Sequence, residues 1–295
     1  MGTYVTITVV SESRHRAEEA IGRAFEEMTR LIDIFNRYDS STPLSVLNQQ
    51  GYLTGPPAEL TDVVTRAIEI CKLSHGAFDI TVKPIVDLFK NHGDDRRPAP
   101  DDIDETLTLV GSDKIELAVD RIGFQRAGMG MTLDGIAKGY IVDRISDVLV
   151  SHGVDNHLIN AGGDIRARGA RQDKRPWAVA IQDPQKKGNY PQVVRLTDGA
   201  VATSGSYEVY YDQQRILHHI IDPQIGTSPN HNVSVSVMSE SVMQADALST
   251  AVFVLRQTAG KRLIESMPNS SSLVIDSNLT QYRSDGWPST HDEMS

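Results

Sequence analysis

The segment at residues 244–255 (QADALSTAVFVL) has the composition of a helix buried in the centre of a domain. Apolar residues recur along it at helical spacing, at Ala245, Leu248, Val252 and Leu255. Asp246 and Thr250 are four residues apart, so the predicted helix presents a carboxylate and a hydroxyl on one face. A buried carboxylate needs a partner, and a hard cation with oxygen ligands would be one. A simpler interpretation also stands, in which a surface Asp lies beside a Thr that bonds to its own backbone.

The composition is that of an ordinary globular protein, with 295 residues of which 39% are hydrophobic and 23% charged. This length can form one large domain or two closely packed lobes. The net charge is −10 and there is no basic run, which excludes nucleic acid as an expected partner. The single cysteine, Cys71, cannot form a disulfide within the chain and is predicted to be a buried structural thiol. No apolar run reaches membrane-spanning length.

Helical periodicity predicts several helices. A long amphipathic helix has its apolar stripe between Ile21 and Phe35. A second begins after Thr61, which would be its N-cap, and ends at Gly76. Further helices are predicted at residues 44–48, directly after Pro84, in the residues leading to Leu107, from the turn at residue 135 to residue 150, and at residues 260–266.

Strand patterns, which are short apolar or alternating runs between turn residues, are spread over the whole chain. Strands are predicted at residues 4–10, 115–119, 123–126, 131–133, 158–160, 177–181, 193–196, 200–203, 207–211, 217–221, 233–237 and 272–275, with a tight extended segment at 77–82. Residues 92–104 are predicted to be a surface connection, and residues 284–295 a frayed polar tail. Helices mixed with mostly antiparallel strands predict an α+β fold, with a cleft where the glycine-bearing turns meet.

Two glycine-bearing turns are candidate sites for an anionic ligand. Residues 133–140 (LDGIAKGY) are predicted to form a strand end, a turn and a helix start, where backbone N–H groups and the helix dipole attract anions. Lys138 adds a positive charge there. The spacing matches neither a Walker A motif nor a dinucleotide fingerprint, so a solvated lysine beside a packed turn is the competing interpretation. Residues 160–164 (NAGGD) contain paired glycines, which permit close approach of a ligand but also simply make turns.

Two further stretches, residues 202–208 (ATSGSYE) and 218–226 (HHIIDPQIG), carry hydroxyls and adjacent histidines. Adjacent side chains on a strand face opposite ways, so only one of His218 and His219 points into a given cleft. Histidine suits proton transfer near neutral pH, and a hydrogen-bonded structural histidine is the competing interpretation. Ser204 is not in a Gly-x-Ser-x-Gly elbow and no cysteine lies near it, which disfavours a hydrolase triad.

The available metal ligands are oxygens. There is no His-x-x-x-His pair and no cysteine cluster, so a zinc site is not expected. Asp246 and Thr250 beside an anion-binding turn favour Mg²⁺ or Ca²⁺. An anion-binding turn, a hard-metal pair and a candidate general base together indicate chemistry on a phosphate or pyrophosphate.

Taken in order, these motifs resemble the ApbE family, the flavin transferases that move FMN from FAD onto a protein hydroxyl. The matching stretches cover nearly the whole chain: residues 1–3, the loop with Tyr38 and Ser40, and residues 75–82, 134–140, 160–164, 202–207, 219–226 and 245–250. The resemblance implies one two-lobed, T-fold-like α+β domain over residues 1–295, with FAD in a cleft between the lobes.

The resemblance also implies roles for individual residues. Asp246 and Thr250 match the family's Mg²⁺ ligands, and a backbone carbonyl at Gly135 would be a third. His219 matches the histidine proposed as the base. Positions that match contacts to the flavin nucleotide are Met1, Tyr38, Ala77, Phe78, Asp79, Lys138 and Ile221.

The chain departs from the family pattern in two places. Many members carry an acidic residue at the position of Thr132 and a small residue at that of Asp134. We include both Thr132 and Asp134 in the predicted FAD site. Either Asp134 supplies the carboxylate two positions after the usual one, or one contact to FAD is lost. Ser249 stands where some members have a second acidic metal ligand, which predicts weaker metal binding.

The implied function is Mg²⁺-dependent transfer of FMN from FAD to a Thr or Ser hydroxyl of a flavoprotein subunit of a redox complex, releasing AMP. The alternatives are an FAD pyrophosphatase that uses water as acceptor, and a non-catalytic flavin-binding protein. Because the chain opens directly on a predicted strand, we expect that a leader or anchor has been removed. The resemblance implies a location outside the cytoplasm, at the outer face of a bacterial membrane.

Overall fold

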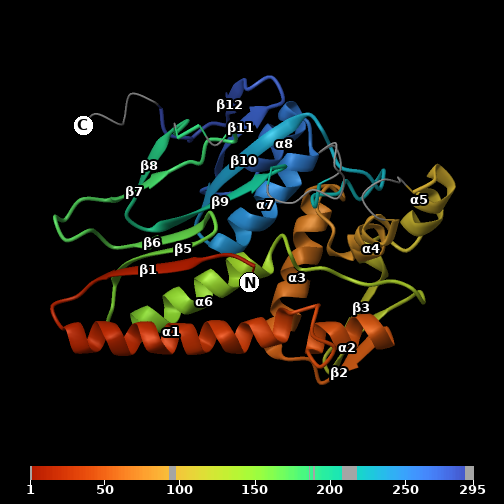
Figure 1. The fold of residues 1–295 in the computed structure, drawn as a ribbon, viewed down its shortest axis with the longest axis horizontal. Helices are drawn as coiled ribbons and strands as arrows, with labels where there is room; N and C mark the ends of the chain where they lie inside the picture. Colours follow the sequence, from red (N-terminus) through yellow and green to blue (C-terminus); the bar gives the residue numbers. More distant parts are fainter. Residues whose placement is uncertain (1, 93–97, 186, 189, 208–217, 290–295) are drawn as a thin grey trace.

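A seven-stranded sheet runs through the computed structural model, which describes residues 2–92, 98–185, 187–188, 190–207 and 218–289. Its strands lie in the order β1 (Val5–Val10), β5 (Asn156–Ala161), β6 (Asp164–Arg168), β9 (Gly199–Gly205), β10 (Asn232–Ser239), β11 (Ser271–Asp276) and β12 (Gln281–Arg283). Every neighbouring pair is antiparallel (Figure 1). The predicted α+β class with mostly antiparallel strands is therefore confirmed.

Helices cover one face of this sheet in two layers, and α8 (Gln257–Glu265) lies against β11 on that face (Figure 1). α6 (Ala137–Ser151) packs against β5 and β6, and α7 (Val242–Val254) packs against β9 and β10. α1 (Arg14–Phe35) lies against α6 on the side away from the sheet. Leu31 and Phe253 are fully buried in the core that these elements share. α7 is thus a buried helix, as its sequence predicts, and nearly all of its residues are shielded from solvent.

The N-terminal half of α6 is joined to the N-terminal end of α7 by a carboxylate and a close contact. Asp143 accepts hydrogen bonds from the backbone N–H groups of Val242 at 3.0 Å and Met243 at 2.9 Å. Burial raises the pKa of Asp143 to about 6, and these two hydrogen bonds oppose that rise. Gly139 leaves no room for a side chain, since a Cβ there would lie 2.5 Å from the Val242 carbonyl oxygen. α6 and α7 therefore keep a fixed spacing at these ends.

The other face of the large sheet packs against a two-stranded sheet made of β7 (Trp177–Ala180) and β8 (Val193–Leu196). Trp287 is 6% exposed in the core between the two sheets, and its Nε1 donates to Gln192 Oε1 at 2.9 Å. The prediction of a frayed tail is therefore wrong for residues 284–289, because burial of the indole fixes this segment. Residues 290–295 lie outside the described part of the chain.

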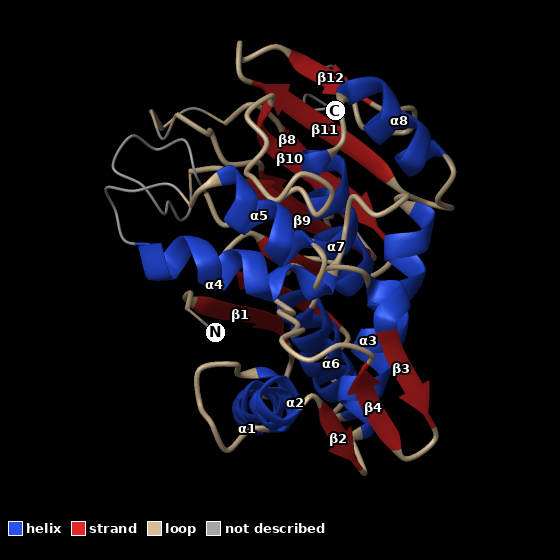
Figure 2. Ribbon diagram, turned by 90° about the vertical axis from the view of Figure 1, so that its right-hand side faces the viewer, coloured by secondary structure: helices blue, strands red, loops and turns tan. Residues whose placement is uncertain are grey.

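Residues 43–124 form a smaller lobe beside the large sheet. Its helices are α2 (Pro43–Gln50), α3 (Ala58–Leu73), α4 (Lys83–His92), α5 (Pro100–Leu107) and the 3-10 helices η1 (Ile80–Val82) and η2 (Ser112–Lys114). Its sheet has the order β2 (Tyr52–Thr54), β4 (Arg121–Phe124), β3 (Ile115–Ala118), and Figure 2 shows it at the lower edge of the molecule, away from the large sheet. None of the helices described in either lobe combines the length and apolar character needed to cross a membrane.

Two helices start earlier than their sequences predict. α3 begins directly after Pro57 rather than after Thr61, because Pro57 takes the N-cap position and its carbonyl oxygen accepts the Thr61 N–H at 3.1 Å. α5 begins at Pro100, inside the predicted surface connection at 92–104. Proline in the first turn followed by acidic residues favours a helix start at this point. Residues 93–97 of the connection lie outside the described residues.

The strand predicted at residues 131–133 does not form. The N–H of Met131 donates to the Asn48 side-chain oxygen at 2.7 Å, and that of Thr132 donates to the Ile80 carbonyl at 2.8 Å. The segment is held by a side chain and by a 3-10 helix, so it joins no sheet ladder. It nevertheless reaches the cavity described below, with Thr132 buried on the way.

Other strand predictions fail for local reasons. The end of the predicted extended segment at 77–82 is η1, because Asp79 Oδ1 accepts the Thr81 N–H at 2.8 Å and caps a 3-10 turn. Residues 218–221, part of a predicted strand, lead into a tight turn and form no strand. Residues 208–217, which hold the rest of that strand and most of the one predicted at 207–211, lie outside the described residues. The short β2, β6 and β12 have no clear strand signal in the sequence.

Candidate active site

A cavity of about 1030 Å³ lies between the large sheet, the N-terminal end of α6, one face of α7 and the smaller lobe. All predicted site residues that the structure describes line it: Tyr38, Ala77, Phe78, Asp79, Thr132, Asp134, Gly135, Lys138, His219, Ile221, Asp246 and Thr250. Met1 lies outside the described residues. The shared location of the twelve residues is a structural finding, and the contact of each with FAD stays a prediction.

Asp246 and Thr250 face the cavity from α7. Asp246 is 6% exposed, and its Oδ2 accepts a hydrogen bond from the Gly139 N–H at 3.1 Å. The interpretation of Asp246 as a solvated surface residue is therefore wrong. A Cβ at Gly135 would lie 3.0 Å from Thr250 Oγ1, so glycine at this position lets the backbone of the turn approach α7 closely.

A second carboxylate, Asp164, lies behind this face. It is 1% exposed at the start of β6, and its Oδ2 is 3.3 Å from Lys138 Nζ in the first turn of α6. Burial raises the pKa of Asp164, and the nearby ammonium opposes that rise. Burial and then the charge of Asp164 raise the pKa of Asp246 well above its usual value. Two buried carboxylates beside one ammonium favour the arrival of a further positive charge.

This oxygen set fits a hard divalent cation. Asp246 offers a carboxylate, Thr250 a hydroxyl and the Gly135 turn a backbone carbonyl, which are the ligand types that Mg²⁺ prefers. Asp164 Oδ2 has the Lys138 ammonium 3.3 Å away as its charged partner, so this carboxylate supports the site through the lysine. No group of three or more His, Cys, Asp or Glu side chains within the described ranges is arranged to hold a metal ion. A metal here would therefore depend on hydroxyl and backbone oxygens.

Ser249, at the position of a second acidic ligand in some ApbE proteins, has a different role in this chain. It is fully buried, and its hydroxyl donates to the Asp246 carbonyl oxygen at 2.9 Å. It also lies 2.7 Å from Ser204 Oγ, which in turn is 3.2 Å from Thr250 Oγ1. Ser249 is thus not a ligand facing the cavity, but the hydroxyl chain that it begins fixes the position of Thr250.

The two adjacent histidines differ in their surroundings. His218 is 3% exposed, its Nε2 donates to the Pro229 carbonyl at 2.8 Å, and its Nδ1 accepts the Ile220 N–H at 3.3 Å. These contacts assign His218 a structural role as a neutral imidazole. His219 is half-buried and lines the cavity. Only one of the pair faces the cleft, as predicted, although residues 218–221 are not a strand.

Asp79 lines the cavity, but its carboxylate is engaged within the protein. Oδ1 accepts hydrogen bonds from the Thr81 hydroxyl at 2.6 Å and from Ser112 Oγ at 2.7 Å, and Oδ2 accepts the Ser112 N–H at 2.9 Å. Burial, followed by the Asp79 charge, raises the pKa of the neighbouring Cys71 thiol to about 12. These contacts shape the wall that Ala77 and Phe78 form. Cys71 is half-buried rather than buried as predicted, and its raised pKa keeps it a neutral thiol.

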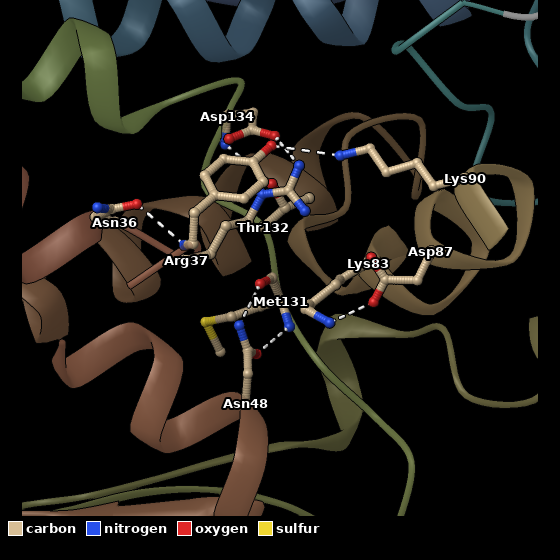
Figure 3. A network of polar contacts seen from close by, with 10 residues as sticks. Asn36, Arg37, Asn48, Lys83, Asp87, Lys90, Met131, Thr132 and Asp134 are labelled. Carbon is tan, nitrogen blue, oxygen red and sulfur yellow. Dashed lines mark hydrogen bonds and ion pairs between the residues drawn. The ribbon is translucent and has the colours of Figure 1, made fainter. Parts of the chain in front are cut away.

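Tyr38 and Asp134 are exposed residues of the cavity lining and define its mouth, and Figure 3 shows the polar contacts around Asp134 from close by. Tyr38 follows α1 and is 74% exposed. Asp134, in the turn before α6, is exposed and forms an ion pair with Arg37, whose Nη2 is 2.8 Å from its Oδ2. Thr132, at the usual acidic position of the family, is buried and carries no charge.

Three residues of the site are absent from the sequence-based prediction. Asp164 ends a recognised turn, and an acid directly after paired glycines at a strand start is the signal that could have identified it. Ser204 is visible as one of several hydroxyls, with nothing to single it out. Arg37 borders the predicted Tyr38, but its partner Asp134 is 97 positions away, so no local pattern connects them.

Comparison with known proteins matches the sequence profile of the ApbE family to residues 1–274. Among curated relatives, the FAD:protein FMN transferase of Vibrio cholerae is 33% identical over 259 residues, covering 85% of this chain and 74% of the relative. The enzyme of the same name from Haemophilus influenzae is 30% identical over 288 residues, covering 92% and 80%.

Solved structures show the same fold. The ApbE protein of Thermotoga maritima superposes with a TM-score of 0.88 at 29% identity, covering 96% of this chain and 94% of that one. The flavin transferase ApbE from Vibrio cholerae gives a TM-score of 0.82 at 29% identity, covering 97% and 94%.

Proposed function

This chain belongs to the ApbE family and is a transferase, and we propose that it moves FMN from FAD to a hydroxyl of a target protein. The observation that carries the proposal is the convergence of Lys138, His219 and the Asp246–Thr250 pair on one cavity. The cavity is of the size and mixed polarity that a dinucleotide ligand requires.

The residues around Gly135 have the roles that phosphoryl transfer requires. Asp246, Thr250 and the Gly135 carbonyl would hold Mg²⁺, which when bound supplies positive charge beside the pyrophosphate of FAD. Lys138 lies in the first turn of α6, where its ammonium and the positive end of the helix dipole attract phosphoryl oxygens. Asp164 keeps the Lys138 ammonium at the cavity wall.

His219 is the candidate general base. In the proposed step, His219 removes the proton from a Thr or Ser hydroxyl of the acceptor, and the oxygen attacks the phosphorus on the FMN side. The bond between that phosphorus and the bridging oxygen breaks, and AMP leaves with the bridging oxygen. The product is FMN joined to the acceptor by a phosphoester bond. Positioned charge and proton removal are the main contributions of a protein to this class of reaction.

We further propose that the acceptor is a flavoprotein subunit of a redox complex and that the reaction takes place outside the cytoplasm. Both follow from the family resemblance. Fractionation of cells that produce the full-length protein, followed by immunodetection, would test the compartment. Recovery in the cytoplasmic fraction alone would contradict it.

The experiment that tests the activity is mass spectrometry of a candidate acceptor after incubation with the protein, FAD and Mg²⁺. Transfer predicts a mass increase equal to one FMN, located on Thr or Ser, with one AMP released for each FMN attached. AMP and free FMN without labelled acceptor would indicate the pyrophosphatase. FAD binding without any AMP would indicate a flavin carrier.

A further inference from the structure

An ion pair crosses the mouth of the cavity and joins two distant segments. Arg37 Nη2 lies 2.8 Å from Asp134 Oδ2, so the loop after α1 is tied to the turn before α6 (Figure 3). The Arg37 side chain is 6% exposed, whereas that of Asp134 is 59% exposed. A guanidinium with so little access to water is stabilised by a carboxylate at this distance, because an unpaired buried charge is costly.

Arg37 in turn contacts the aromatic residue that follows it. Its Cζ lies 4.7 Å from the centroid of the Tyr38 ring, within cation–π range. Lys90, on α4, lies 5.3 Å from the same centroid, and its Nζ donates to the Tyr38 hydroxyl at 3.3 Å. Because Tyr38 is 74% exposed, packing contributes little to its position, and these charged groups fix the ring at the mouth.

The carboxylate of Asp134 is poorly suited to direct contact with FAD. A dinucleotide brings its own negative charges, and a carboxylate facing them would repel them. Pairing with Arg37 offsets the charge of Asp134 and holds its carboxylate against the loop after α1. Thr132, which stands at the position of the usual acid, is a neutral buried residue and cannot replace Asp134 in this pair.

We propose that Asp134 and Arg37 are positioning residues for FAD, which hold Tyr38 as a preformed wall against which a flat ring of the dinucleotide stacks. This proposal rests on FAD being the ligand of the cavity. Asp134 is an acid at a position where the family often has a small residue. In this proposal it acts on FAD binding through Arg37 and Tyr38 and makes no direct contact with FAD. Preformed walls lower the cost of ordering the site when a ligand binds.

The test measures FAD affinity by isothermal titration calorimetry without acceptor, and KM and kcat for FAD in the transfer assay. Asp134→Ala and Asp134→Asn should each raise Kd and KM about tenfold, because both remove the charge that holds Arg37, while kcat stays within about twofold. Asp134→Glu should recover most of the affinity, since it keeps the carboxylate. Asp87→Asn is the matched control, because Asp87 is a nearby carboxylate that pairs with Lys83 and does not line the cavity.

A double-mutant cycle separates positioning from a direct or merely structural role. If Asp134 acts through Tyr38, adding Asp134→Ala to Tyr38→Leu should change Kd by less than about twofold. Full additivity of the two substitutions would overturn the proposal, as would an Asp134→Ala variant that loses kcat at unchanged KM. Because FAD binding is measured without acceptor, absence of transfer in every variant would contradict the proposed activity and leave this test intact.

Discussion

At the α7 end of the cavity Asp246 is 6% exposed and surrounded by core residues, whereas at the mouth Tyr38 is 74% exposed and contacted by Arg37 and Lys90. The first end is positioned by close packing of a central helix against β9 and β10. The second is positioned by ion-pair and cation–π contacts at a surface. The end proposed to carry the chemistry is therefore held by core packing, and the end proposed to receive the ring is held by charged groups of which Asp134 and Lys90 are exposed to solvent and salt.

Removing the Asp246 carboxylate should have the largest effect on activity. Asp246→Ala deletes the one charged oxygen of the proposed metal set, and transfer should fall about a thousandfold. The measurement is the rate of FMN attachment at several Mg²⁺ concentrations. Asp147→Asn, at an exposed position of α6, should leave that rate unchanged. Near-normal transfer by Asp246→Ala would remove Asp246 from the metal site.

Gly139→Ala tests the claim that packing fixes the α7 end. The added Cβ would lie 2.5 Å from the Val242 carbonyl oxygen and 2.7 Å from Met243 Cα, so α6 and α7 must separate. We expect a loss of about 3 kcal/mol in the free energy of unfolding, measured with urea. Gly22→Ala is the control, because Gly22 is exposed within α1 with open space around it, and it should stabilise by roughly 0.5–1 kcal/mol. Equal stability of the two variants would show that the junction is loose.

His219→Ala should slow transfer about a hundredfold, because the acceptor proton then has no positioned base. FAD affinity should change little, which calorimetry without acceptor can check. His218→Ala is a poor control for chemistry, since His218 is a buried structural residue. Transfer by His219→Ala at the parent rate would place the base elsewhere in the cavity.

The affinity for Mg²⁺ should rise with pH. Because the pKa values of Asp164 and Asp246 are raised in the folded protein, protons remain on this pair at a pH where ordinary carboxylates are ionised. A metal must displace them, so affinity should grow by up to about tenfold per pH unit for each proton released. Calorimetry in two buffers of different ionisation enthalpy counts the protons. An affinity for Mg²⁺ that does not change with pH, with no proton released on binding, would contradict a metal site at this carboxylate pair.

The raised pKa values of Asp164 and Asp246 also predict how the stability of the metal-free protein depends on pH. A carboxyl group whose pKa is raised by folding binds its proton more tightly in the folded state than in the unfolded state. The stability of the metal-free protein should therefore fall as pH rises from the unfolded pKa toward the folded one, and bound Mg²⁺ should offset that loss.

Tyr38→Phe should have the smallest effect. It removes the hydrogen bond from Lys90 but keeps the ring over Arg37, so KM for FAD should rise only about twofold to threefold. Repeating the assay in about 0.5 M salt should reduce the difference between variant and parent, since the contact lies at the surface. A salt-independent loss of tenfold or more would mean that the hydroxyl contacts FAD itself.

The sequence predicts the long elements well because their periodicity is set by burial. α7 lies close to its expected bounds and α1 ends where expected, although α1 begins at Arg14, before its predicted apolar stripe. Each helix has enough apolar positions to define a face or a buried core. The segment at 131–133 could not be placed, since its N–H partners are a side chain at Asn48 and a carbonyl at Ile80. Hydrogen bonds to such distant partners produce no periodic pattern in the local sequence, so they cannot be predicted from it.

In the candidate site, too, some residues can be predicted from the sequence and others cannot. Asp246, Thr250 and Lys138 are visible because each lies in a motif whose residue types fit a metal or an anion. Asp164, which pairs with Lys138, and Ser204, which contacts Thr250, are not visible in the same way, because these contacts join residues far apart in the sequence. The same holds for Arg37, which pairs with Asp134. A carboxylate moved from position 132 to 134 can be seen in the sequence, but its attachment to Arg37 can be seen only in three dimensions.

The junction between α6 and α7 limits how such a chain can diverge. Gly139 touches the backbone at Val242 and Met243, and Asp143 binds the N–H groups of the same two residues. A change on one helix alone leaves an overlap or an unpaired amide that the other helix must correct. Substitutions at these positions are therefore expected to be inherited in matched sets, because neither helix can accept such a change alone.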